Sequence, residues 1–280
     1  IYVLDSPILT NSQLKKFKKF FSKKIKIIDC TFDIEKSLKE RIELIREEAE
    51  TAVREGSACL VLSDKNISNQ KASIPSILTV GAVHSHLVKH GLRGYCSLNV
   101  ECSDAMDTHS FAILIGAGAT TVNPYLAIDS IYQRFEKKLF GKSDFEACVN
   151  RFKKSIDAGL LKIMSKMGIS VISSYRGGCN FEAVGLSRAI VSDYFPGMSS
   201  RISGIGIIGI EKKIKELHEK FNAKNVFNLP IGGLYRYRKS GENHQHQGKL
   251  IHLLQSAVGS NSYELYKKYS AGIHNLPTIS

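Results

Sequence analysis

The chain has 280 residues, and 43% of them are hydrophobic, which is enough to bury a globular core and too many for a disordered protein. Its net charge of +13 raises nucleic acid and anionic membranes as partners, but the lysines are spread over the whole chain and no nucleic-acid-binding module is recognisable. No apolar run reaches about 18 residues and no secretion signal opens the chain, so we expect a cytoplasmic protein with no membrane and no nucleic-acid partner.

The first predicted element is a helix in the run LKKFKKFFSKK. Helical spacing places Leu14, Phe17, Phe20 and Phe21 on one side and the lysines on the other, a pattern typical of a surface helix and also of a helix lying on a membrane. The aromatic side continues into a strand of the same domain, so we favour the surface helix.

Strands and helices then alternate along the chain. Apolar runs predict strands at 25–28, 58–62, 95–100 and 120–122. The segments between and after them predict helices at about 34–56, 75–90, 109–119, 124–140 and 145–166. Gly168 is expected to end the last of these, before a fifth strand at 169–172 and a helix from Phe181. Because strand–helix repeats build parallel sheets, the sequence predicts an α/β fold with a mainly parallel sheet.

The pattern changes beyond Gly197. A charged helix is predicted at 211–221 and a last helix at 249–257. Between them the run LPIGGLYRYRKSGENHQHQGK has no clear period, so we expect irregular structure there. We therefore divide the chain into an α/β domain at 1–228 and an irregular and helical segment at 229–280.

Polar residues follow several of the predicted strands. Asp64, Glu101 and His109 either converge as a site at the carboxyl edge of the sheet or cap helices and pair with lysines, and we favour the second interpretation. Arg176 follows the predicted fifth strand, where it is suited to hold an anion. A local role, on backbone carbonyls or on Glu182, is the favoured alternative.

The remaining motifs assign no catalytic, cofactor-binding or metal-binding residue. His86 and His90 have the i, i+4 spacing of metal ligands, but no carboxylate completes a known ligand spacing, and His84 falls on the apolar side as a core histidine. The six cysteines contain no CxxC pair and are expected to be reduced and buried. Residues 204–209 spell GxGxxG, but the run before them predicts a poor strand and no acidic residue follows at the required distance.

Several long segments of the chain resemble one protein family. These segments are LLKIMSKMGIS, SYRG, FEAVGL, IPSILTVGAVHSHLVKHGLR, YFPGMSSRISGIG and GGLYRYRKSGENH. Together they resemble the glutamate synthase large chain, in the part between its glutaminase domain and its flavin barrel. The resemblance covers nearly the whole chain and implies an α/β unit similar to a distorted or incomplete (β/α) barrel. The chain begins at Ile1 without a Met, so we expect a segment of a longer protein.

This resemblance implies a function for the whole enzyme and a narrower one for the segment. The enzyme is an oxidoreductase of ammonia assimilation that forms L-glutamate from glutamine and 2-oxoglutarate with FMN and a 3Fe–4S cluster. The segment is implied to be the central domain, running at 229–280 toward the FMN barrel, to join the glutaminase and FMN domains, and to bind no cofactor itself. A small electron-donating subunit or ferredoxin is implied as a further partner, and the segment alone is expected to be inactive.

The chain also departs from the family pattern. Residues 103–110 stand where the family usually reads GEAREVHH. Cys96 and Cys102 have the spacing of the first two iron–sulfur cluster ligands, but Asp107 stands in place of the third. Polar positions are altered more than apolar ones. Two alternatives therefore stay open, a degenerate free-standing remnant without activity and an independent α/β protein that binds a small molecule or nucleotide.

Overall fold

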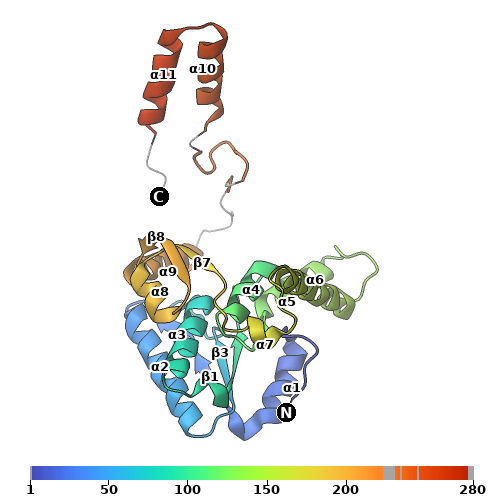
Figure 1. The fold of residues 1–280 in the computed structure, drawn as a ribbon. Helices are drawn as coiled ribbons and strands as arrows, with labels where there is room; N and C mark the ends of the chain where they lie inside the picture. The colour runs from blue at the N-terminus through green and yellow to red at the C-terminus, as the bar shows by residue number, and fades with distance from the viewer. Residues whose placement is uncertain (1, 223–230, 234, 245, 277–280) are drawn as a thin grey trace. The chain divides into compact units, whose positions relative to one another are not determined.

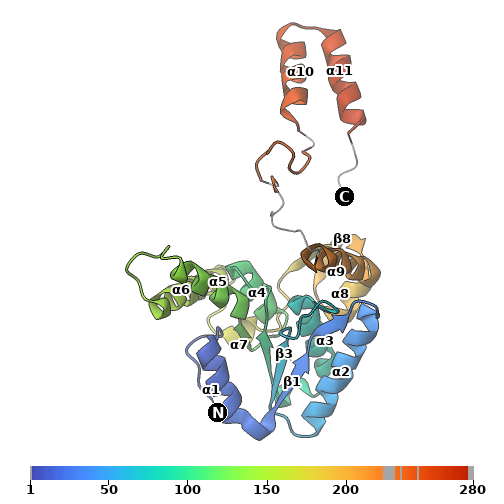
Figure 2. The same cartoon turned by 180° about the vertical axis from the view of Figure 1, so that it is seen from behind.

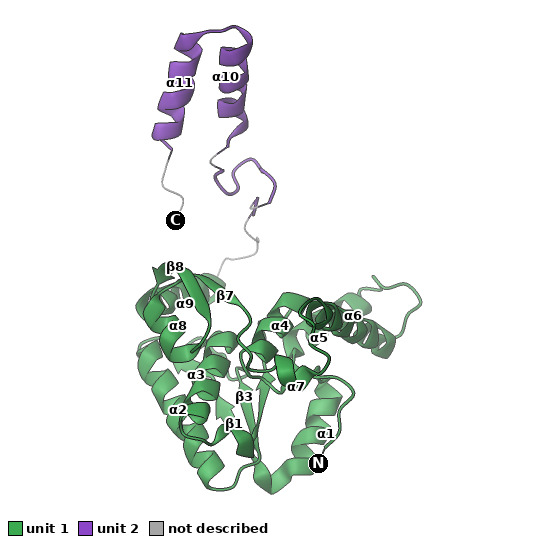
Figure 3. Cartoon of the chain, viewed as in Figure 1, with its two compact units in different colours: residues 1–222 green, residues 223–280 purple. Residues whose placement is uncertain are grey.

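The computed structural model describes residues 2–222, 231–233, 235–244 and 246–276. The chain forms two compact units, unit 1 at 1–222 and unit 2 at 223–280 (Figure 3). Unit 2 contains α10 (Gly248–Gly259) and α11 (Tyr263–His274), so the predicted last helix is confirmed and α11 is additional. Its other described residues form neither helix nor strand. The predicted domain boundary at 228 falls at 223–230, outside the described residues.

Unit 1 is built on a four-stranded parallel sheet. Its strands lie in the order β1 (Ile25–Asp29), β3 (Cys59–Ser63), β5 (Ser97–Glu101) and β6 (Thr121–Asn123). Helices α2 (Leu38–Arg54), α3 (Ser76–Lys89) and α4 (Thr108–Gly116) connect successive strands. Each strand lies beside the next strand of this sheet along the chain, and right-handed crossovers then place the three helices on one face. The predicted α/β fold with a mainly parallel sheet is confirmed.

The two faces of this sheet differ in chemistry because side chains alternate along each strand. The face under α2, α3 and α4 is apolar, and Leu60, Leu98 and Val122 lie in its core. Helix α1 (Asn11–Phe21) packs on the opposite face, where Phe17 and Cys59 share a second, smaller cluster. In Figures 1 and 2, α1 lies across β1 and β3 from α2 and α3. The predicted surface helix is confirmed.

The segment before α1 occupies the outer edge of β6. The backbone N–H of Leu9 donates to the carbonyl of Val122 at 2.9 Å, and the N–H of Val122 donates to the carbonyl of Pro7 at 2.8 Å. Residues 7–9 therefore occupy the position beside β6 where the next parallel strand would otherwise lie. This explains why the predicted strand at 169–172 is wrong.

The chain turns into a short helix at this point instead. Helix α6 (Phe145–Lys166) ends as predicted at Gly168, whose φ of +71° is easily reached without a side chain. A single turn follows, α7 (Ile172–Tyr175), and the hydroxyl of Tyr175 donates to the carbonyl of Ala112 in α4 at 3.1 Å. Burial of this tyrosine fixes the turn against the main core.

A second, two-stranded parallel sheet follows, made of β7 (Glu182–Leu186) and β8 (Ser199–Ile205). Helix α8 (Arg188–Tyr194) joins the two strands and α9 (Ile207–Asn222) follows them. The helix predicted from Phe181 is wrong, because these residues form β7. In this strand the buried Ala183 lies between two exposed neighbours, which is the alternation of a strand. The run before the GxGxxG motif, predicted to be a poor strand, forms the exposed strand β8.

The other described elements of unit 1 complete its surface. Strands β2 (Thr31–Asp33) and β4 (Lys71–Ser73) form an antiparallel pair, and α5 (Tyr125–Glu136) packs against α6. None of the helices in the described residues has the length and apolar content that a membrane span requires.

We predict that Gly204→Ala destabilises the β7–β8 sheet. A Cβ atom at Gly204 would lie 2.1 Å from the carbonyl oxygen of Gly185, whereas a Cβ at Gly206 would meet only the Ser187 Oγ at 3.9 Å. We expect Gly204→Ala to lower the free energy of unfolding by about 1–3 kcal/mol and Gly206→Ala to change it little. Urea unfolding of both variants measures this, and equal effects would show that the glycine is not needed for strand packing.

Candidate functional site

The carboxyl ends of β3, β5 and β6 meet at one edge of the sheet. Glu101, at the end of β5, is only 4% exposed. Its Oε2 accepts hydrogen bonds from Lys18 Nζ of α1 at 2.8 Å and from Ser63 Oγ at 2.9 Å, and Lys65 Nζ lies 3.1 Å from its Oε1. Residues from α1, β3 and the loop after β3 therefore converge on one carboxylate.

The charge state of Glu101 follows from these neighbours. Burial by itself would raise the pKa of Glu101, but the hydrogen bond and charge of Lys18, with the bonds from Ser63 and Lys65, outweigh it and hold this pKa below its ordinary value of 4.5. A carboxylate with a lowered pKa that is surrounded by donors is a weak base. Glu101 is thus suited to holding α1 and β3 together rather than to proton transfer.

Asp64 follows β3 at the same edge and is 2% exposed. Its Oδ2 accepts from the backbone N–H of Ser103 at 2.9 Å, from the Ser103 hydroxyl at 2.6 Å and from the Ser73 hydroxyl at 3.2 Å. Its Oδ1 has no hydrogen-bond partner among the described residues. Burial, followed by the charge of Asp64, raises the pKa of Tyr125 above its ordinary value. Asp64 therefore joins the loops that follow β3 and β5.

Hydrogen bonds within the domain also connect side chains on the polar face of the sheet behind this edge. Thr121 donates to Asn99 Oδ1 at 2.8 Å, and Asn99 Nδ2 donates to the carbonyl of Leu60 at 3.0 Å. Asn123 Nδ2 donates to the carbonyl of Leu9 at 2.8 Å, which fixes the start of α1. The favoured interpretation of Glu101, that it pairs with lysines, agrees with this arrangement.

We predict that Glu101→Gln lowers the free energy of unfolding by about 1–2 kcal/mol at neutral pH, because two lysines lose their carboxylate partner. A lowered pKa in the folded state adds stability that is present above pH 4.5 and is lost as the pH falls through that lowered pKa. The difference from the unmodified chain should therefore shrink below pH 4.5. Urea titrations at several pH values measure it, with Glu47→Gln as the exposed control, and a difference that persists in acid would contradict the ion-pair assignment.

His109 does not join the two carboxylates. It lies in α4, makes no hydrogen bond to Asp64 or Glu101 among the described residues, and lines an apolar cavity of about 590 Å³ with Leu78, Phe181 and other side chains. The predicted carboxyl edge thus contains Asp64 and Glu101 without the histidine.

Arg176 lies in another part of unit 1, close to His84 and Arg93. Glu182, its predicted alternative partner, instead pairs with Arg201 at 3.5 Å. Arg93 donates from Nε to His84 Nδ1 at 3.1 Å and from Nη1 to the carbonyl of Cys96 at 2.6 Å. Burial, then the charges of Arg93 and Arg176, lower the pKa of His84 to about 4. His84 is therefore neutral, which matches the prediction of a core histidine.

We predict that His84 makes the fold less stable as the pH falls from 6.5 to about 4. The unfolded state takes up a proton on this imidazole near pH 6.5, whereas the folded state does so only near pH 4. In His84→Gln this contribution to the pH dependence should disappear, whereas the exposed His252→Gln should keep it. Thermal unfolding between pH 7 and 4 measures both variants, and parallel profiles for His84→Gln and the unmodified chain would rule out the assignment.

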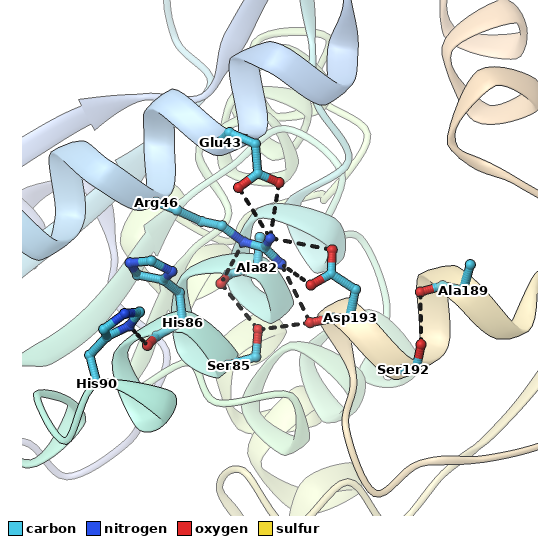
Figure 4. A network of polar contacts seen from close by, with 9 residues as sticks. All are labelled: Glu43, Arg46, Ala82, Ser85, His86, His90, Ala189, Ser192 and Asp193. Atoms are coloured by element: carbon cyan, nitrogen blue, oxygen red, sulfur yellow. Dashed lines mark hydrogen bonds and ion pairs between the residues drawn. The ribbon is translucent and has the colours of Figure 1, made fainter.

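A polar network ties α2 to α3 and α8 (Figure 4). The buried Arg46 donates to both carboxylate oxygens of Asp193 at 3.1 and 3.3 Å, to Glu43 at 3.0 Å and to the carbonyl of Ala82 at 3.3 Å. Its guanidinium also lies 4.6 Å from the ring centroid of Tyr194. One side chain thus joins three helices.

Next to this network, the structure places a carboxylate beside His86 and His90. The sequence spacing had offered no carboxylate to complete a metal site with these two histidines. His86 Nε2 lies 2.6 Å from Oε2 of Glu50, which comes from α2, and His90 Nδ1 lies 3.9 Å from the same oxygen. Sequence reasoning missed Glu50 because it is 36 residues away from His86. Only the packing of α2 on α3 brings the three side chains together.

The cysteines do not fit an iron–sulfur cluster. Cys96 and Cys102 are buried, and desolvation raises the pKa of both thiols, which opposes the thiolate form that iron requires. Asp107, in the position of a third ligand, is the N-cap of α4 and accepts from the N–H of Ser110 at 2.9 Å. Within the described residues no three cysteines come together as ligands. All six cysteines are free, and five are buried as predicted, whereas Cys179 is only half-buried.

These features define an α/β domain whose buried charges are mostly engaged with other parts of the same domain. Residues 1–187 match the family described as glutamate synthase central domain. The chain belongs to this family.

Known relatives align with nearly the whole chain. It is 49% identical over 279 residues to the glutamate synthase [NADPH] large chain of Azospirillum brasilense, covering 99% of this chain and 18% of that protein. It is 36% identical over 291 residues to the ferredoxin-dependent glutamate synthase of Pyropia yezoensis, covering 98% of this chain and 19% of that protein. The chain thus spans about a fifth of the length of these relatives.

Among solved structures, DHODH from Eimeria tenella matches 55% of this chain and 37% of its own, with 15% identity and a TM-score of 0.37. The fold class rests on the parallel sheet of unit 1 and not on this likeness.

Proposed function

We propose that the chain is an architectural part of a glutamate synthase, an oxidoreductase that forms L-glutamate from glutamine and 2-oxoglutarate in ammonia assimilation. The observation that carries the proposal is the 49% identity across 99% of the chain to a relative of which the chain spans only 18%. A segment of this kind joins the glutaminase and FMN domains of the same enzyme. Residues 1–228 are the central domain in this proposal, and 229–280 lead toward the FMN barrel.

The engagement of the buried charges supports an architectural role. Glu101 has two lysine partners and Arg46 joins three helices. Groups held in this way stabilise a fold, whereas a catalytic base needs an oxygen or nitrogen free to meet its substrate. A rigid domain of this kind is suited to holding two active sites at a fixed separation.

FMN and the 3Fe–4S cluster belong, in this proposal, to the full-length enzyme and not to this segment. The burial of its cysteines opposes cluster binding, and Gly204 of the GxGxxG run serves the close packing of two strands. The Pyropia yezoensis relative is named as ferredoxin-dependent. We therefore propose ferredoxin or a small electron-donating subunit as a partner of the whole enzyme, in the cytoplasm.

Exposed apolar side chains support the presence of neighbouring domains. In unit 1, Val184 of β7 and Ile202 of β8 are 65% and 61% exposed. In unit 2, Tyr235 is 99% exposed and Tyr263 is 69% exposed. Patches of such side chains favour association, so we propose that the FMN-barrel part of the enzyme covers them.

We predict that the purified chain is inactive by itself. It should show no flavin absorption bands after gel filtration and should release no ammonia from glutamine, because a glutaminase needs an activated thiolate. Burial raises the pKa of Cys30 to about 12, and it also raises the pKa of Cys59, Cys96, Cys102 and Cys179. Absorption spectroscopy measures bound flavin, and an ammonia assay measures glutamine hydrolysis. Retained flavin, or ammonia release that a single cysteine substitution abolishes, would contradict the proposal.

A chimera tests the positive side of the same proposal. The matching segment of the Azospirillum brasilense large chain is replaced by residues 1–280, and glutamate formation from glutamine and 2-oxoglutarate is assayed. The proposal expects activity in the chimera. A folded chimera that contains its flavin but forms no glutamate would show that this chain cannot serve as the central part.

A further inference from the structure

A group of potential metal ligands lies on the outer side of α2 and α3, away from the carboxyl edge of the sheet. Glu50, His86 and His90 offer one carboxylate oxygen and two imidazole nitrogens, and these ligand atoms all lie within 4.8 Å of one another. The rings of His86 and His90 have centroids 4.3 Å apart. Among the described residues this is the one group of three such side chains.

The backbone beneath this group is held in place. Arg46 is one helical turn from Glu50 on α2, and Ala82 is one turn from His86 on α3. Figure 4 shows Arg46 beside Ala82, with His86 and His90 nearby. The bond from Arg46 Nε to the carbonyl of Ala82 at 3.3 Å therefore ties the two helices next to the ligand group. Sites on rigid helices keep their ligands in place better than sites on loops.

The ligands themselves are oriented by further contacts. Arg54 holds Oε1 of Glu50, with Nε at 2.8 Å and Nη2 at 2.7 Å, and this leaves Oε2 turned toward the imidazoles. Nδ1 of His90 lies 2.8 Å from the carbonyl of His86. When the proton is on Nδ1, His90 donates this bond and the lone pair of the ring is on Nε2. Both contacts are of the kind that orients ligands in known metal sites.

We propose that Glu50, His86 and His90 bind one Zn²⁺ ion that links α2 to α3. Two imidazoles and one carboxylate suit zinc better than the harder Mg²⁺ or Ca²⁺, and water completes a four-coordinate shell. Zn²⁺ binds His86 in the tautomer that carries its proton on Nδ1, so the proton between Nε2 and Glu50 Oε2 moves to Nδ1 by exchange with solvent and Nε2 offers its lone pair to the ion. Ligand atoms about 2.0–2.2 Å from zinc in tetrahedral geometry are about 3.3 Å apart, so this pair widens from 2.6 Å by side-chain rotation.

This site goes beyond the architectural role and does not depend on it. The three ligands are partly exposed, so the ion reaches them without unfolding of the domain. By joining two helices it stabilises the folded state, since a ligand that binds only the folded state shifts the unfolding equilibrium by mass action.

The experiment titrates ZnCl₂ into the metal-free 280-residue chain by calorimetry and follows the melting temperature. We expect one ion per chain from this site, a raised melting temperature, and binding at least tenfold weaker in each of Glu50→Gln, His86→Ala and His90→Ala. The exposed Glu47→Gln and His252→Ala are matched controls that should bind as the unmodified chain does. Circular dichroism of each variant establishes that a weaker binder is still folded.

A second readout separates this site from the cysteines and from other histidines. Co²⁺ in place of Zn²⁺ should give visible bands that disappear in His90→Ala, without the near-ultraviolet thiolate band of cysteine ligation. Three results would overturn the proposal. They are a Zn²⁺ stoichiometry in the triple variant Glu50→Gln/His86→Ala/His90→Ala equal to that of the unmodified chain, an unchanged affinity for Zn²⁺ in Glu50→Gln, or a thiolate band in the Co²⁺ spectrum. Unchanged affinity in Glu50→Gln would reduce the site to a histidine pair.

Discussion

The structure depends on a parallel sheet whose two faces have different chemistry. Because successive strands are neighbours, α2, α3 and α4 all cover one face, and this face is apolar. The other face contains Asn99, Glu101, Thr121 and Asn123, which are buried and must find hydrogen-bond partners within the protein. Helix α1 supplies part of that pairing through Lys18, and its own start is fixed by Asn123. The buried hydrogen bonds and ion pairs at the carboxyl edge therefore follow from the packing of α1 on this polar face.

The second sheet is attached through charge as well as through apolar contacts. Arg46 of α2 reaches Asp193 of α8, and Ser85 of α3 donates to the backbone carbonyl of the same residue at 3.2 Å. A buried guanidinium without its carboxylate is costly, so this pairing favours one arrangement of α8 against α2 and α3. The bond from Arg46 to the carbonyl of Ala82 holds α2 on α3 beside Glu50. One network thus positions both the β7–β8 region and the ligand group.

The elements with a clear period could be predicted from the sequence. The strands at 25–28, 58–62, 95–100 and 120–122 lie within two residues of β1, β3, β5 and β6, because their apolar residues fill one face of a sheet. The strand at 169–172 could not be judged locally, since the place beside β6 is taken by Pro7–Leu9, more than 150 residues earlier. The short strand β7 was missed for a related reason, because its partner β8 comes only after α8.

The site could be predicted in part. Asp64 and Glu101 follow buried strands, and parallel strands end at a common edge, so their placement there follows from the pattern. The partners of Glu101 could not be predicted, because Lys18 is 83 residues away on the helix that packs on this face of the sheet. Glu50 illustrates the same limit. Spacing along one helix reveals His86 and His90, but the third side chain depends on how two helices pack.

The most direct test of the account compares activity and stability in the chimera that contains this chain. The central claim is that the buried charges at the carboxyl edge stabilise the fold and take no part in the chemistry. Glu101→Gln and Asp64→Asn should then lower the melting temperature of the chimera while leaving kcat for glutamate formation unchanged at a temperature where all forms are folded. A large fall in kcat with an unchanged melting temperature would contradict the claim.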